Sequence, residues 1–175
     1  ICQKDVRMRV CEHALNKNER TVLFMYSIRS IKQDYKDEYA LINVCNYICR
    51  DCDEQYQGGM NISAYPVIEM KALKEQYNAT GGNQLFHIIL SFSRKYGFTA
   101  EMAYRFTMLV IEELKQYQFY YGLHTDTKCP HVHFMINSIS MNGERLKLAA
   151  VENHIKSVCK SVMEKVQNNS HILYH

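Results

Sequence analysis

The stretch LHTDTKCPHVHFMIN, residues 123–137, decides the fold of this chain. Residues 131–139 are rich in β-branched and aromatic side chains, which is typical of a buried strand. Because side chains alternate along a strand, His131 and His133 lie on the same face. A preceding strand that ends at His124 is separated from them only by a loop short enough for a hairpin. We therefore expect three imidazoles to converge in the middle of a sheet.

Three converging histidines predict a metal site, because burying three imidazoles without a shared partner is costly. Neutral imidazoles leave the charge of a divalent ion uncancelled, and three protein ligands leave positions open for substrate, as in catalytic sites. The ligands alone do not name the ion. Asp126 and Asn137 are candidates to orient a ring or a phosphate beside it. His87, alone in another predicted strand, is either a core residue or a partner of the metal ligands.

A tyrosine lies on the flank of the first predicted helix, residues 36–52. Apolar residues recur there at helical spacing and form one face. Tyr47 lies roughly 110° from the centre of that face, at about 100° per residue, so its side chain points sideways rather than into the core. The chain has 13 tyrosines, and Tyr35 and Tyr39 compete with Tyr47 for a place near the metal.

Length and composition predict a single domain, and the order of its predicted elements indicates an α+β fold with an antiparallel central sheet and helices packed on it. The chain has 175 residues, of which 47% are hydrophobic, and this is enough for one core. We expect residues 1–20 to be an N-terminal extension and residues 21–175 to form the domain. The predicted strands are 22–28, near 64–68, 85–93, 119–124 and 131–139, and the predicted helices are 36–52, near 71–77, 99–117 and 148–167.

Charge and cysteine content bound the partners and the compartment. The net charge of +3 permits a nucleic-acid partner, and Arg50 and Lys128 are candidates to contact DNA phosphates. Seven cysteines cannot all pair within one chain, and no apolar stretch resembles a signal or a membrane span. Reduced thiols in the cytoplasm are the simplest interpretation.

Two segments together resemble the HUH-type relaxases of the MobP group, which are mobilisation nucleases of conjugative and mobilisable elements. These segments are Leu41-Ile-Asn-x-x-x-Tyr47-Ile and residues 123–137, and the likeness covers roughly residues 21–165. In that family the first motif carries a nucleophilic tyrosine, which matches Tyr47. The third motif carries the metal-binding histidines, and it also covers Asp126 and Asn137. The metal triad would be His124, His131 and His133.

The resemblance implies a bacterial cytoplasmic enzyme that nicks single-stranded DNA at a transfer origin. Metal-assisted attack by the tyrosine would give a 5′-phosphotyrosyl linkage and a free 3′-hydroxyl, which can later be resealed. The implied cofactor is Mg²⁺ or Mn²⁺, and the implied partners include accessory mobilisation proteins and a coupling protein. Related replication initiators carry their tyrosine after the histidine strand, whereas here Tyr47 precedes it.

Two alternatives remain open from the sequence. A metal-dependent hydrolase would use the tri-histidine ion to activate water, with Asp126 or Glu69 as general base. A DNA-binding module of the same fold would have no catalytic activity.

Overall fold

The computed structural model describes residues 25–169 and residue 173, except residues 51, 94, 96 and 126. The predicted extension, residues 1–20, lies outside this part. In chain order the elements are β1 (Tyr26–Ser30), α2 (Ala40–Cys49), the 3₁₀ helix η1 (Glu54–Tyr56), β2 (Gln57–Met60), α3 (Pro66–Gln76), β3 (Leu85–Phe92), α4 (Ala100–Glu112), β4 (Phe119–His124), β5 (His131–Asn137) and α5 (Leu148–Asn168).

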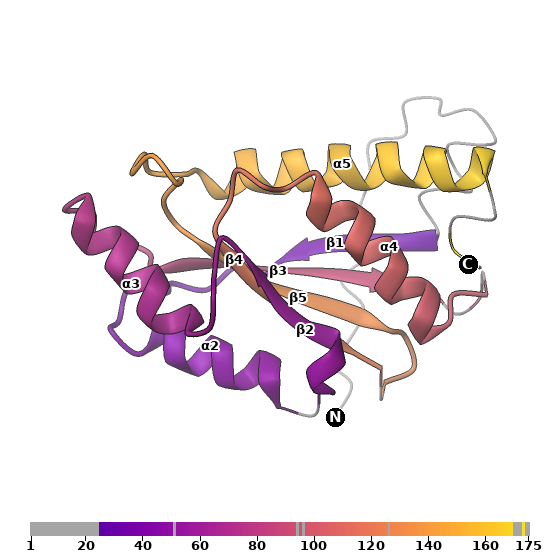
Figure 1. The fold of residues 1–175 in the computed structure, drawn as a ribbon, viewed down its shortest axis with the longest axis horizontal. Helices are drawn as coiled ribbons and strands as arrows, with labels where there is room; N and C mark the ends of the chain where they lie inside the picture. The colour runs from indigo at the N-terminus through magenta and orange to yellow at the C-terminus, as the bar shows by residue number, and fades with distance from the viewer. Residues whose placement is uncertain are drawn as a thin grey trace.

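The five strands form one sheet in the order β1-β3-β5-β4-β2, and every neighbouring pair is antiparallel. Figure 1 shows α4 and α5 on one side of the sheet and α2 and α3 on the other. The predicted α+β class is therefore confirmed. Strand β5 occupies the centre, so the histidines that it carries are flanked by strands on both sides.

Alternation along β5 divides the molecule into two cores. Val132, Phe134 and Ile136 face α4 and α5 and belong to the larger hydrophobic cluster. Met135 faces the opposite way and packs in a smaller cluster with α2 and α3. His133 shares the parity of Met135, so the predicted metal ligands lie on the α2 side of the sheet.

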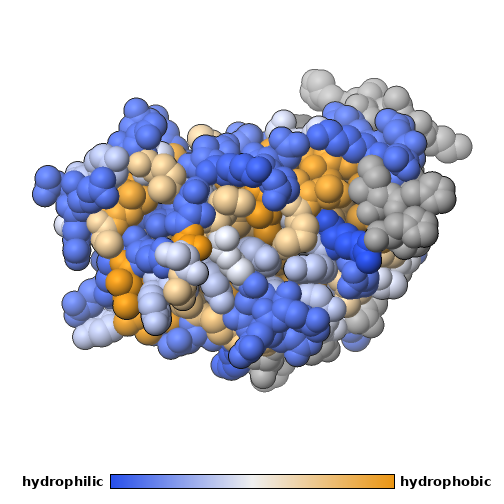
Figure 2. Space-filling model, in the orientation of Figure 1, coloured by the Kyte–Doolittle hydropathy of each residue, from blue (hydrophilic) through white to orange (hydrophobic). Residues whose placement is uncertain are grey.

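Helices α4 and α5 form as their sequence predicts. The Thr99 side chain caps α4 by accepting a hydrogen bond from the Met102 amide at 3.2 Å. Helix α5 buries one apolar stripe, made of Val151, Ile155, Val158, Val162 and Val166. Among the described residues, no helix is long and apolar enough to cross a membrane. Figure 2 shows hydrophobic residues on one face of the molecule in separate patches among hydrophilic ones.

The strand predicted near residues 64–68 is wrong, because helix α3 begins there. Pro66 occupies its first turn, where the missing amide proton has no helical partner to lose. The Glu69 carboxylate accepts backbone hydrogen bonds from Ser63, Ala64 and Tyr65, each at 2.8 Å. These contacts cap the start of α3 more strongly than local β-propensity favours a strand.

The edge strand β2 is absent from the sequence prediction. Its two glycines, Gly58 and Gly59, pair with β4. A Cβ at Gly58 would lie 2.7 Å from the Tyr121 hydroxyl, so the glycine makes room for a ring on the neighbouring strand. Elsewhere the prediction misplaces only ends: α2 begins at Ala40 and α4 ends at Glu112.

Candidate metal centre and tyrosine cleft

Three histidines from the β4–β5 hairpin meet on the α2 side of the sheet. His124 pairs with His131 across the hairpin, and His133 follows two residues later on the same face. Their ring centroids are 4.8 to 5.2 Å apart, and one nitrogen of each ring lies within 4.8 Å of the others. The predicted histidine cluster is confirmed.

Backbone carbonyl oxygens contact one nitrogen on each of two rings of the cluster. His124 Nε2 lies 2.9 Å from the Ile48 carbonyl oxygen, and His131 Nδ1 lies 3.1 Å from the Cys129 carbonyl oxygen. A carbonyl only accepts, so these two nitrogens carry protons, and a metal ligand atom would be the opposite nitrogen of each ring.

His133 supplies the most direct sign that the cluster suits a cation. Its Nε2 atom is buried and has no hydrogen-bond partner among the described residues. Buried polar atoms are nearly always paired, so this nitrogen calls for a ligand. Three neutral nitrogens fit a divalent metal ion, which would draw the rings slightly together because such bonds are about 2.0–2.1 Å long.

His87 contacts His133, so it is a partner of the histidine cluster rather than an isolated core residue. His87 Nε2 lies 2.8 Å from His133 Nδ1, and His87 Nδ1 lies 3.2 Å from the Tyr35 hydroxyl oxygen. With His133 Nε2 as the ligand atom, His133 Nδ1 donates to His87, and His87 in turn donates to Tyr35. This chain of hydrogen bonds fixes both the tautomer and the orientation of the His133 ring.

Burial keeps the inner histidines neutral. Desolvation, followed by the neighbouring histidines, lowers the pKa of His133 to about 2. Desolvation and the charge of Arg29 lower the pKa of His87 to about 4. At neutral pH both rings are therefore uncharged, and the His133 lone pair is free of a proton.

Tyr47 reaches the cluster because α2 packs directly on β4. Gly122 leaves the necessary space, since a Cβ there would lie 2.7 Å from Ile48 Cγ2 and 3.0 Å from the Ile48 carbonyl oxygen. The same carbonyl accepts the hydrogen bond from His124. Helix α2, which carries Tyr47, is therefore held against His124 of the histidine cluster.

Geometry distinguishes Tyr47 from its competitors. Its side chain is 43% exposed, and its ring centroid lies 5.1 Å from that of His133 and 6.2 Å from that of His124. Tyr39 precedes the first turn of α2, about 12 Å away along the helix axis at 1.5 Å per residue. Tyr35 is buried before the helix, and its hydroxyl contacts His87. Only Tyr47 combines an accessible ring with direct contact to the cluster among these three.

A cleft of about 360 Å³ opens beside the cluster, between the end of β1 and α2. We call it the tyrosine cleft. Its lining includes Arg29, Asn43, Tyr47, His87 and His133. Arg29 lies on the edge strand and places a cation on the side of the cleft opposite Tyr47. The sequence alone does not single out Arg29, because its position relative to β3 and β5 depends on strand pairing.

The other site residues predicted from the sequence have mixed outcomes. Asn137 does not orient a ring or phosphate at the cluster: it lies about 13 Å along β5 from His133 at 3.3 Å per residue. Its buried amide contacts Lys74, Gln118 and the Met70 carbonyl instead. Asp126 lies outside the described residues.

The two predicted DNA contacts border the site. The Arg50 guanidinium lies over the Tyr47 ring, 5.5 Å from its centroid, which is within the range of a cation–π contact. Lys128 is exposed in the loop between β4 and β5. Both are placed at the rim of the cluster rather than far from it.

Comparison with known proteins identifies the family. The family model described as "Relaxase: MobA/VirD2-like, nuclease domain" matches residues 47–167. A comparison with curated protein sequences found no match. The matched segment begins at the tyrosine and includes all three histidines, β3, β4, β5 and most of α5. This chain therefore belongs to the MobA/VirD2-like relaxase family and contains its nuclease domain.

Proposed function

We propose that this chain nicks one strand of DNA at a transfer origin and that Tyr47 is the nucleophile. Relaxase nuclease domains cut DNA, and the family generally uses a divalent metal. One observation supports the finer proposal most strongly: the exposed ring of Tyr47 contacts His133. Its hydroxyl would then lie near a metal ion held by the histidine cluster.

The reaction transfers a phosphoryl group within the tyrosine cleft. The Tyr47 oxygen forms a bond to the scissile phosphorus and loses its proton, while the bond from phosphorus to the 3′ oxygen breaks. The products are a 5′-phosphotyrosyl linkage and a 3′-hydroxyl. Positioning and charge neutralisation dominate such transfers. A divalent cation, of which Mg²⁺ and Mn²⁺ are our candidates, would neutralise charge on the scissile phosphate when bound.

The protein side chains supply position and additional charge. His124, His131 and His133 would hold the cation, and the chain through His87 keeps His133 in the ligand tautomer. Arg29 and Arg50 flank Tyr47 and can pair with neighbouring phosphates of the strand. Accessory mobilisation proteins and a coupling protein are the partners that this function implies.

A hydrolase that activates water receives less support from the described residues. Glu69, one of its two candidate bases, caps α3, and three backbone amides lower the pKa of its carboxyl to about 2. A carboxylate with so low a pKa is a weak base, and its contacts tie it to the start of α3.

The decisive experiment detects a covalent adduct. Single-stranded oligonucleotides that tile both strands of the DNA flanking the gene are labelled at the 3′ end and incubated with the protein and Mn²⁺. A nicking reaction leaves the labelled fragment on the protein, and the adduct survives a denaturing gel.

Two variants make the assay specific. Tyr47→Phe should form no adduct, whereas the matched control Tyr39→Phe should form as much as the wild type. Adduct formation by Tyr47→Phe would disprove the nucleophile assignment. Multiple turnover without any covalent species would instead favour the hydrolase.

A further inference from the structure

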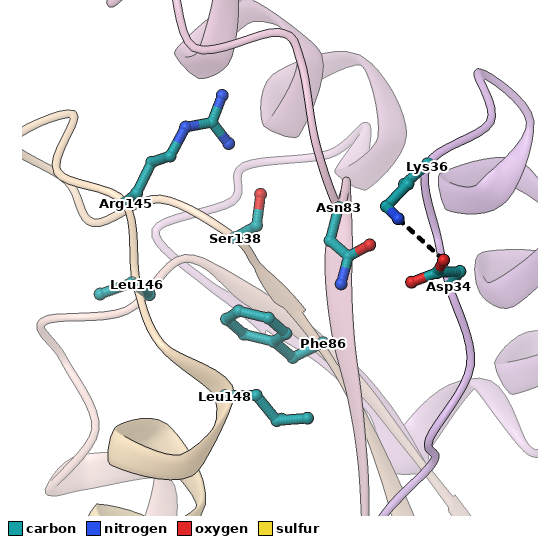
Figure 3. Close-up of a pocket in the computed structure, with 8 residues that line it drawn as sticks. All are labelled: Asp34, Lys36, Asn83, Phe86, Ser138, Arg145, Leu146 and Leu148. Atoms are coloured by element: carbon teal, nitrogen blue, oxygen red, sulfur yellow. Dashed lines mark hydrogen bonds and ion pairs between the residues drawn. The ribbon is translucent and has the colours of Figure 1, made fainter.

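A second cavity, of about 460 Å³, lies at the end of the sheet remote from the histidine cluster. Figure 3 shows it between the segment that carries Arg145 and Leu148 and the segment that carries Asn83. Ser138 follows the last residue of β5, and Phe86 lies near the start of β3. The cavity belongs to neither the metal cluster nor the tyrosine cleft.

Two polar atoms in this cavity have no partner. Ser138 Oγ and Asn83 Oδ1 are both buried without a hydrogen bond among the described residues. Ser138 is only 4% exposed, and Figure 3 shows Ser138 and Asn83 on neighbouring segments of the cavity lining. Unpaired buried polar atoms are destabilising and rare, so these two atoms indicate a polar ligand.

The charges around the cavity favour an anion. Arg145 and Lys36 lie in its lining, and Asp34 is the one carboxylate there. Asp34 is already paired with Lys36 at 2.8 Å, which leaves the Arg145 charge in excess. Lys74 is buried nearby, and the charge of Arg145 helps to lower its pKa. An anion would relieve the repulsion between these two cations.

The floor of the cavity is apolar. Phe86, Leu146 and Leu148 form it, and Phe86 is 7% exposed. A ligand that combines an anionic group with a flat apolar surface would contact both the polar residues and the apolar residues of the cavity. A nucleotide has this combination, and a base can pack on an aromatic ring regardless of its sequence.

One extended segment, residues 31–37, separates the two cavities. Its odd-numbered side chains, including Gln33 and Tyr35, line the tyrosine cleft. Two of its even-numbered side chains, Asp34 and Lys36, line the second cavity. The two cavities therefore lie on opposite sides of a single backbone segment.

We propose that the second cavity binds one nucleotide of the DNA strand that the metal centre cuts, with the phosphate against Arg145 and Ser138 and the base against Phe86. This inference rests on the proposed function. It adds a subsite that grips the strand away from the scissile bond, and so contributes to binding rather than to chemistry.

Binding of a fluorescein-labelled single strand of mixed sequence, followed by anisotropy without metal, tests the subsite. We expect Arg145→Ala to raise Kd about tenfold, which corresponds to about 1.4 kcal/mol, and Ser138→Ala to raise it severalfold. Loss of one phosphate contact should also reduce the slope of log Kd against log salt by about 0.7. The matched control is Lys147→Ala, which removes an exposed cation outside the cavity and should change Kd less than twofold.

A structural role for Ser138 predicts a different result. If Ser138 serves only the subsite, Ser138→Ala should leave the melting temperature unchanged or raise it, because its hydroxyl has no hydrogen-bond partner among the described residues; a lower melting temperature would show a structural role. If Arg145→Ala has the same Kd and the same salt slope as the wild type, the subsite proposal is wrong, even if Tyr47 forms its adduct. Conversely, weaker binding by Arg145→Ala in a protein that never forms an adduct would preserve the subsite and reject the nicking function.

Discussion

Replacing His87 tests whether the buried chain of hydrogen bonds tunes the metal centre. His87→Ala removes the acceptor 2.8 Å from His133 Nδ1. It leaves a buried N–H unpaired, which costs about 1–3 kcal/mol, and it no longer selects the tautomer with Nε2 free. Loss of a partner behind a metal ligand typically lowers affinity about 10–100-fold, or about 1.4–2.7 kcal/mol.

Calorimetric titration with Mn²⁺ at neutral pH measures this effect. His87→Gln should recover much of the affinity, because its side-chain oxygen can accept from His133 Nδ1. Tyr35→Phe should have a smaller effect, since it removes only the more distant acceptor. Melting curves of the metal-free proteins identify any variant that fails to fold. If a folded His87→Ala protein binds Mn²⁺ as tightly as the wild type, the reasoning is refuted. If the His87→Gln and His87→Ala variants bind Mn²⁺ equally weakly, the loss of affinity does not come from the hydrogen bond.

Three further predictions follow from burial and packing. Gly122→Ala should abolish adduct formation and lower stability by about 1–3 kcal/mol, because the new Cβ pushes α2 away from β4; normal adduct yield would contradict this. Lys74 has its pKa lowered to about 8 by burial, so the unfolded chain binds more protons between pH 8 and 10.5. Urea denaturation should therefore show stability rising by up to about 3 kcal/mol across that window, and Lys74→Met should lack the rise. The lowered pKa of His133 predicts that metal-free protein loses stability as pH falls from 7 to 5, because the unfolded chain takes up the proton; a flat profile would show that the ring is not neutralised by burial.

The histidine cluster could be predicted from the sequence because its geometry is local. A strand ending at His124, a short loop and the spacing of His131 and His133 are enough to bring the rings together, whatever surrounds the hairpin. The sideways direction of Tyr47 likewise follows from helical periodicity alone. Its contact with the cluster needed the helix to pack on β4, which the sequence does not state.

The residues that the sequence missed depend on tertiary pairing. His87 reaches His133 only because β3 and β5 are neighbours in a particular register, and Arg29 enters the cleft only because β1 pairs with β3. Asn137 shares the face of His133, but distance along the strand gives it another role beside Lys74. Strand β2 was not predicted because two adjacent glycines favour a turn locally, whereas Tyr121 on the neighbouring strand requires the space at Gly58.

The central claim is that Tyr47 makes the covalent bond to DNA. Its most direct test is mass spectrometry of the adduct after digestion of the DNA and the protein, which locates the residual nucleotide on one peptide. The account predicts a nucleotide mass on the peptide that contains Tyr47, attached through its phenolic oxygen. A nucleotide on Tyr39, or on any residue outside α2, would contradict it.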